Sequence, residues 1–351
     1  MNAAVDFTSV PVLGLSPGRG PAEARRALVS AIGDICHHVG FLIVTEHGVA
    51  RDTIDGVFAA SRRLFDLPLE QKLLIDKRQS RHFRGWEPVG AESTNNRPDI
   101  REQVDIWTEH PARAPTVSPR YQRLLGPNQW LPEAVLPGFR DAVERWLTEV
   151  STLAESLMGL LAESLELPRD HFERLFGDER MSLTKLIRYP PTPPRQFGVN
   201  AHHDTGFLTV LAPGDTPGLE VENAAGEWIP VPVVPGALVV NLGEMLQSMT
   251  GNYFVATPHR VVTRAARQSV GYFHGPSLDT ALTPLRLPPG FAEAVAASPR
   301  HAGAGFMAQR LETEAGVGDM RSPHRPDVYG EQLWNYFARS YPDNVARHYP
   351  D

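Results

Sequence analysis

The sequence predicts an α+β fold in which helices flank a β-sandwich or β-barrel core. In residues 21–68 and 139–166 apolar side chains recur every three to four positions over long stretches, which is typical of amphipathic helices. From about Met181 the pattern changes to short apolar runs, about ten residues apart, that Pro- and Gly-rich turns separate. After Pro284 helical and irregular segments return.

The predicted elements follow this order along the chain. Helices are expected over residues 21–40, 51–68, 139–166 and 329–343, and a short buried strand over residues 41–44. Residues 79–132 have the pattern of long ordered loops. The core strands are expected over residues 183–189, 206–212, 218–223, 228–234, 237–242, 259–263 and 269–275.

No linker-like segment divides the chain, so residues 1–351 are predicted to form a single compact unit. Within it, residues 1–180 form a mostly helical region that packs on the core, and residues 181–280 form the catalytic core. Residues 281–351 form a C-terminal helical segment, in which residues 302–341 are a candidate lid.

Composition excludes several classes of protein. The net charge of −7 offers no basic field for nucleic acid, and no apolar run approaches the ~20 residues that span a bilayer. The N-terminus lacks a signal-peptide pattern. Cys36 is the only cysteine, which rules out an internal disulfide and favours a cytoplasmic location. The oligomeric state is open.

The stretch NAHHDTGFLTVL contains a candidate metal-binding pair. Residues i and i+2 of a strand point to the same face, so His202 and Asp204 can bind one cation, whereas His203 must point away. His259 begins another apolar strand 55 residues after Asp204, far enough for the chain to return beside the first strand. Two imidazoles and one carboxylate form the facial triad of non-haem iron(II) oxygenases, with zinc as the competing ion.

A second polar pair follows on the next predicted strand. Arg267 and Ser269 are again at i and i+2, eight residues after His259 at the nearest point. A guanidinium binds a carboxylate through two hydrogen bonds, and a serine hydroxyl adds a third. This pair predicts an anchor for an acid.

With these residues the chain resembles the iron(II)- and 2-oxoglutarate-dependent dioxygenases, in the branch of isopenicillin N synthase. The resemblance covers nearly the whole chain. It rests on the segments VPVLGLS, VGFLIVTEHGV, FDLPLEQK, RGWEPVGAE, LIRYPP, NAHHDTGFLTVL, ATPHRVV and RQSVGYF. It implies a double-stranded β-helix (jelly-roll) core, and an oxidoreductase of the kind found in secondary metabolism.

The resemblance also implies the roles of the site residues. His202, Asp204 and His259 would bind Fe(II), Arg267 and Ser269 would hold the far carboxylate of 2-oxoglutarate, and the Tyr189 hydroxyl would support a carboxylate. Dioxygen would then oxidise a small-molecule substrate by hydroxylation, desaturation or ring closure, while 2-oxoglutarate is converted to succinate and carbon dioxide. One departure is Ile187, because many plant-type members carry an asparagine at this position that contacts the co-substrate.

Two alternatives stay open at the level of sequence. Isopenicillin N synthase uses no 2-oxoglutarate and holds its peptide substrate with its own Arg-x-Ser pair, so Arg267 and Ser269 do not discriminate between the two. A non-catalytic jelly-roll protein with a structural metal is the other, although it would need a closed ligand set.

The substrate is predicted to be a metabolite or an amino-acid-like molecule. Arg84 in FRGWEP and Phe273, four residues after Ser269, are the candidate substrate residues. His37, His38 and His82 lack acidic partners at strand spacing and are interpreted as structural.

Overall fold

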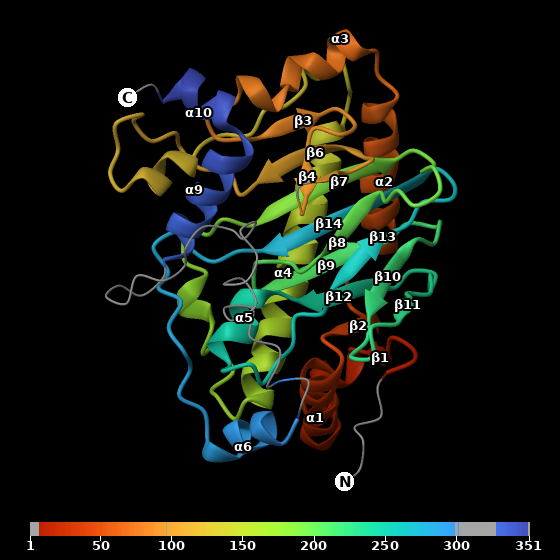
Figure 1. Ribbon diagram of the computed structural model, residues 1–351, viewed down its shortest axis with the longest axis vertical. Helices are drawn as coiled ribbons and strands as arrows, with labels where there is room; N and C mark the ends of the chain where they lie inside the picture. The colour runs from red at the N-terminus through yellow and green to blue at the C-terminus, as the bar shows by residue number, and fades with distance from the viewer. Residues whose placement is uncertain (1–6, 96, 299–300, 302–327, 350–351) are drawn as a thin grey trace.

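The structure, a computed structural model, describes residues 7–95, 97–298, 301 and 328–349. Two β-sheets form its centre, and the smaller sheet lies in front of the larger one in the view of Figure 1. The larger sheet contains, in spatial order, β1 (Val12–Gly14), β2 (Phe41–Thr45), β12 (Leu238–Leu242), β9 (Leu208–Ala212), β14 (Arg267–His274), β7 (Leu183–Tyr189), β6 (Glu102–Trp107) and β3 (Gly85–Glu87). The smaller sheet contains β11 (Trp228–Pro230), β10 (Leu219–Glu222), β13 (His259–Val261) and β8 (Val199–His202).

The pairing is antiparallel throughout both sheets except between β1 and β2. This arrangement is the double-stranded β-helix core that the resemblance implies. The larger sheet also extends beyond residues 181–280, because β1, β2, β3 and β6 come from the first third of the chain. A separate small hairpin joins β4 (Ser93–Thr94) to β5 (Arg97–Pro98).

The central strands read as continuous apolar runs because both of their faces are covered. On β12, Val240 packs into the core between the larger sheet and the helices, whereas Val239 packs into the core between the two sheets. Leu42 and Phe41 on β2 divide in the same way. Strand alternation therefore produces two hydrophobic cores from one sheet.

Helices form the outer layer. The long helix α4 (Phe139–Ser164) runs behind the larger sheet and packs against β9 and β14, and α1 (Ala22–His38) and α2 (Arg51–Phe65) pack against α4 (Figure 1). All three helices were predicted, with ends that agree within a few residues. The apolar stripe of α4 is buried, with Trp146 and Val150 both at 0% exposure.

Several elements were not predicted, and β3 and the β4–β5 hairpin lie, like β6, in the region where loops were expected. Residues 102–107 form β6, although the sequence pattern indicated loops over 79–132. Every residue of β6 is buried, but Glu102, Gln103 and Asp105 are polar, so neither a continuous apolar run nor an alternating pattern is visible in the sequence. The short helix α5 (Glu244–Met249) was also missed, because six residues are too few for a helical period to be recognised.

The C-terminal part contains α6 (Pro289–Ala297), α9 (Tyr329–Ser340) and α10 (Pro342–His348). The predicted C-terminal helix is confirmed as α9, where Trp334 and Phe337 are buried. In the first third of the chain, the four-residue helix α3 (Leu69–Lys72) follows α2. Most of the candidate lid, residues 302–327, lies outside the described residues. Among the described residues, no helix has the length and apolar character needed to cross a bilayer.

Candidate active site

Three potential metal ligands meet where β8 and β13 pair. His202 ends β8 and lies directly opposite His259, the first residue of β13. Asp204 follows two residues after His202, and its Oδ1 lies 3.7 Å from Nε2 of each histidine. The three ligand atoms are within 4.8 Å of one another, which is close enough for one ion to contact them all.

Backbone carbonyls fix the orientation of both imidazoles. Nδ1 of His202 lies 2.9 Å from the carbonyl oxygen of Asn200, and Nδ1 of His259 lies 3.2 Å from that of Thr257. An N–H at Nδ1 donates to each carbonyl, which leaves the Nε2 lone pair free to bind a metal.

Hydrogen bonds also hold the carboxylate of Asp204. Its Oδ2 accepts from Oγ1 of Thr209 at 2.5 Å and from Nδ2 of Asn241 at 2.7 Å. These donors lie on β9 and β12 and occupy one oxygen, so that Oδ1 faces the two histidines. The sequence reasoning missed Thr209 and Asn241, although a polar residue within each apolar run was a visible signal.

The electrostatics keep the three groups in the protonation states that bind metal. Burial lowers the pKa of His202, and it lowers that of His259 to about 4, although the Asp204 carboxylate opposes both shifts. Burial alone would raise the pKa of Asp204, but the two histidines and the hydrogen bonds outweigh it and lower its pKa. At neutral pH the site therefore presents two neutral imidazoles and one carboxylate.

His203 is not part of this group. Its Nδ1 lies 3.6 Å from Oε1 of Glu244 on α5, and its side chain is 35% exposed. The strand argument selected the histidine that the structure places beside Asp204. Its premise was wrong in one detail, because β8 ends at His202 and Asp204 lies just beyond the strand. Thr209 and Asn241, rather than strand geometry, hold Asp204 in place.

The donor set fits iron. Two imidazoles and one carboxylate from a single face form a facial triad, in which three of six coordination positions stay available to other ligands. A closed structural zinc site would need a fourth protein ligand, and the described residues bring only these three together.

The predicted acid-binding pair, Arg267 and Ser269, lies on the face of β14 that points toward the smaller sheet. Arg267 is directly opposite Tyr189 of β7, and its Cζ lies 5.1 Å from the centre of the tyrosine ring. The Nε of Arg267 donates to the Thr216 carbonyl at 3.1 Å, while its buried Nη1 has no hydrogen-bond partner among the described residues. Ser269 donates to the Tyr189 hydroxyl at 3.5 Å. A buried guanidinium nitrogen without a partner is a suitable donor for a carboxylate ligand.

The other predicted residues take different positions. Phe273 shares the inward face of β14 with Ser269 and is partly exposed. Ile187 lies opposite Ser269 and presents an apolar side chain there. Arg84 is 0% exposed and donates to the carbonyls of Thr108 and Leu124, which favours a structural role over the predicted substrate contact.

His37 and His82 are buried, and each has Nδ1 within 2.8 Å of a backbone carbonyl. Burial lowers the pKa of His82 to about 4. Both arrangements agree with the structural interpretation of these residues.

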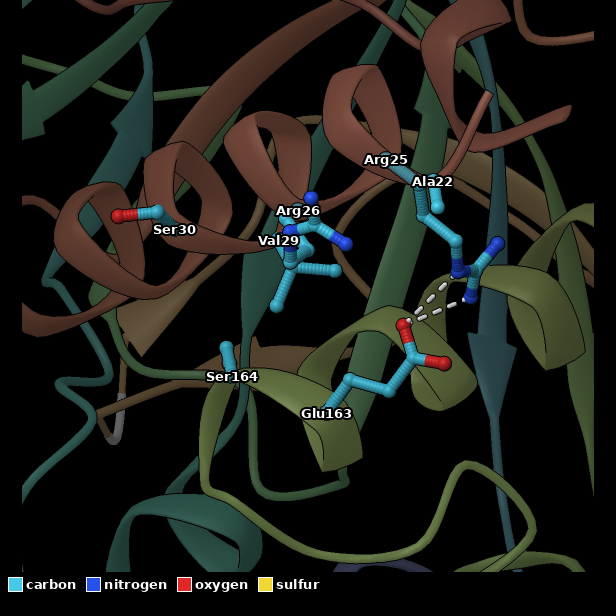
Figure 2. Close-up of a pocket in the computed structure, with 7 residues that line it drawn as sticks. All are labelled: Ala22, Arg25, Arg26, Val29, Ser30, Glu163 and Ser164. Atoms are coloured by element: carbon cyan, nitrogen blue, oxygen red, sulfur yellow. Dashed lines mark hydrogen bonds and ion pairs between the residues drawn. The ribbon is translucent and has the colours of Figure 1, made fainter. Parts of the chain in front are cut away.

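Two surface cavities lie away from the three ligands. One, of about 450 Å³, lies between α1 and α4, and Arg25 pairs with Glu163 across it at 2.7 Å (Figure 2). A second cavity of about 610 Å³ includes Arg267 and Gly236 in its wall but none of the metal ligands.

Comparisons with known proteins agree with this site. Residues 179–276 match the 2OG-Fe(II) oxygenase superfamily, and residues 10–133 match the N-terminal region described as non-haem dioxygenase in morphine synthesis N-terminal. The 2-oxoglutarate-dependent dioxygenase frbJ of Dothideomycetidae sp. is 34% identical over 81% of this chain and 78% of its own length. The homoarginine-6-hydroxylase 2-ODD-233 of Oryza sativa is 30% identical over 80% of this chain and 89% of its own length.

Solved structures have the same fold. A full-length Neurospora crassa protein, solved in complex with alpha-KG, aligns over 97% of this chain and 98% of its own, with a TM-score of 0.73 and 21% identity. The dioxygenase for auxin oxidation in rice aligns over 79% and 86%, with a TM-score of 0.61 and 28% identity.

Fold and site together define a non-haem iron oxygenase. The chain belongs to the 2OG-Fe(II) oxygenase superfamily, in its isopenicillin N synthase-like branch, and is an Fe(II)/2-oxoglutarate-dependent dioxygenase. This assignment decides against the two alternatives that the sequence left open, the oxidase that uses no 2-oxoglutarate and the non-catalytic jelly-roll protein. The family implies a small-molecule substrate.

Proposed function

We propose that this dioxygenase oxidises a carbon atom of a small, amino-acid-like metabolite, most simply by hydroxylation. The observation that carries the proposal is the shared inward face of the larger sheet. On it, Thr209 holds the metal-binding carboxylate, and Arg267 presents a buried nitrogen without a partner among the described residues. Relatives that act on an amino acid support the substrate class, since those from rice, soybean and Arabidopsis are named homoarginine-6-hydroxylases.

Three residues are proposed to hold the co-substrate. The guanidinium of Arg267 binds the far carboxylate of 2-oxoglutarate, and Ser269 and Tyr189 complete the hydrogen bonds around it. Tyr189 also stacks beside Arg267, which keeps the guanidinium from turning away. Ile187 gives the co-substrate an apolar wall where many plant-type members have an amide.

When bound, iron and 2-oxoglutarate supply the oxidising chemistry by activating dioxygen. The protein binds and orients its ligands and keeps water from the reacting carbon. Phe273 is proposed to form an apolar side of the substrate site. The buried thiol of Cys36 is consistent with a reducing, cytoplasmic location, which we also propose.

A mass-spectrometric screen tests the reaction. Purified enzyme is incubated with Fe(II), 2-oxoglutarate, dioxygen and a panel of amino acids and small acids. The expected result is a substrate that gains one oxygen or loses two hydrogens while an equal amount of succinate forms. The Asp204→Ala variant should be inactive. If iron-loaded enzyme produced no substrate-dependent succinate with any member of the panel, the proposed substrate class would be wrong.

A further inference from the structure

A buried cluster of charged side chains, which we call the inner charge cluster, lies at the β3–β6–β7 end of the larger sheet. Its carboxylates are those of Glu87, Glu92, Asp99 and Asp105, and its cations are Lys77, Arg101 and Lys185. Six of the seven residues are at most 9% exposed. With four carboxylates and three cations, the cluster carries one net negative charge in a place where an uncompensated charge is costly.

The cluster lies on the same sheet face as the proposed co-substrate anchor. Asp105 on β6 is opposite Lys185 on β7, and Lys185 shares its face with Tyr189 two positions beyond Ile187. The same register continues across Gly271 of β14. The absence of a side chain at Gly271 makes room for the Phe273 ring, because a Cβ there would be 3.2 Å from it.

A chain of hydrogen bonds also joins the cluster to the metal ligands. Arg101 pairs with Asp99 at 3.2 Å, and Asp99 accepts from Nδ2 of Asn200 at 3.0 Å. The carbonyl of Asn200 in turn accepts from the His202 ring. The cluster and the iron site are therefore two parts of one polar interior.

Two buried acceptor atoms, one in the cluster and one on a residue that contacts it, have no hydrogen-bond donor among the described residues. They are Oε1 of Gln103, at 1% exposure, and Oδ1 of Asp105, at 3% exposure. The Gln103 amide cannot be turned over to remove this deficit. Its Nε2 donates to Oε2 of Glu87 and Oε2 of Glu92, and a reversed amide would place an oxygen against both carboxylates.

In this arrangement no cation of the cluster hydrogen-bonds to either acceptor, and Arg101 donates to Glu92. Lys77 uses its three N–H groups on Glu87, Asp105 Oδ2 and the Tyr341 hydroxyl. Lys185 donates to both oxygens of Glu92, and its Nζ stays 3.7 Å from Asp105 Oδ1. A buried acceptor without a donor costs about 1–3 kcal/mol, so these two atoms are suited to a ligand that brings its own donors.

We propose that Gln103 and Asp105 bind a cationic nitrogen group in the side chain of the substrate, an ammonium or a guanidinium. Such a group supplies both the missing donors and the missing positive charge. Strands lie about 4.8 Å apart, so Asp105 on β6 is roughly 14 Å along the sheet from β9, which carries Thr209. The oxidised carbon is therefore several bonds away from the bound nitrogen. This inference rests on the proposed function and specifies its substrate.

The test measures binding without turnover. Enzyme loaded with Fe(II) and 2-oxoglutarate is titrated anaerobically with homoarginine and arginine, and with homocitrulline and citrulline as counterparts whose side chains are neutral. Binding is followed by the change in the visible absorption of the iron–oxoglutarate complex and by the shift in Tm. We expect a cationic compound to bind at least tenfold more tightly than its neutral counterpart.

Variants locate the effect. Asp105→Asn and Gln103→Met should each weaken binding of the cationic compounds by about 10- to 100-fold, because a hydrogen bond to a charged group contributes about 1.5–3 kcal/mol. Glu102→Gln is the matched control. Glu102 is a buried acid next to Gln103 on β6, but it faces the other side and binds Lys72 and Arg188, so cation binding should not change.

The outcomes separate the two proposals. If the absorption of the iron–oxoglutarate complex never forms, the proposed function fails, and the Tm shifts still test cation binding. Three outcomes overturn only this inference, provided that the iron–oxoglutarate complex forms. They are equally tight binding of the neutral counterparts, no binding of any cationic compound, and parent-like binding by both cluster variants. Far-UV circular dichroism checks that each variant is folded. If only one of the two cluster variants folds, that variant by itself still tests the inference.

Discussion

Thr209 donates a 2.5 Å hydrogen bond to Oδ2 of Asp204, so the other carboxylate oxygen faces both histidines of the iron site. The donor comes from β9 in the larger sheet, whereas the histidines lie on β8 and β13 in the smaller one. The iron site therefore depends on how the two sheets pack against each other.

This contact predicts the effect of Thr209→Val. Loss of a hydrogen bond to a metal-binding carboxylate typically weakens metal affinity by about 10- to 100-fold, so Fe(II) or Mn(II) titration should show a loss in that range. Thr184→Val is the control, because the buried hydroxyl of Thr184 on β7 has no partner among the described residues. Equal metal affinity in the two variants would contradict the positioning role of Thr209.

The two adjacent histidines should differ in their effect on metal binding. In the parent protein, Fe(II) or Mn(II) should raise Tm, because the metal binds only the folded state. His202→Ala should abolish this rise while the metal-free protein stays folded, whereas His203→Ala should retain it. The reverse pattern would show that His203, and not His202, is the ligand.

Substitutions in the acid-binding pair, Arg267 and Ser269, should weaken binding of the co-substrate. Arg267→Lys replaces a planar guanidinium by a single ammonium, and we expect the KM for 2-oxoglutarate to rise by roughly 10- to 100-fold. Ser269→Ala removes one hydrogen bond and should raise it by less. Arg260→Lys is a suitable control, because Arg260 binds Glu220 at 2.7 Å on the smaller sheet. An unchanged KM in Arg267→Lys would place the anchor elsewhere.

His274 should make the stability of the protein sensitive to acid. Burial lowers the pKa of His274 to about 3, and the nearby Arg180 adds to this effect. Between the ordinary pKa of ~6.5 and this value, the unfolded chain binds a proton that the folded protein does not. The free energy of unfolding should therefore fall as the pH drops through this window, by up to about 5 kcal/mol from this residue.

Chemical denaturation at pH 7, 5 and 4 measures this decline. His274→Phe removes the titrating group and preserves stacking on Phe176, whose ring centre lies 4.0 Å from that of His274. The variant should lose less stability between pH 7 and pH 4 than the parent protein. A decline of the same size in both would show that other groups account for the acid sensitivity.

Much of the scaffold could be predicted because its periodicities are local. The stripe of α4 repeats at helical spacing, and the central strands are short apolar runs bounded by turns. The sequence could not predict β6, because its buried polar residues are stabilised by partners far along the chain, such as Asp105 by Lys77 and Lys185. A polar strand of this kind is indistinguishable from a loop until its partners are known.

The sequence by itself was enough to select His202, Asp204 and His259 as candidate metal ligands and to predict Arg267 and Ser269 as an acid anchor, because strand alternation and spacing constrain which side chains share a face. Only the tertiary structure decided what holds and surrounds them. It placed Arg84 in a structural position, brought Thr209 and Asn241 to Asp204, and assembled the inner charge cluster at the β3–β6–β7 end of the larger sheet. These relationships join residues on different strands, and the energies that create them arise only when the strands pack together.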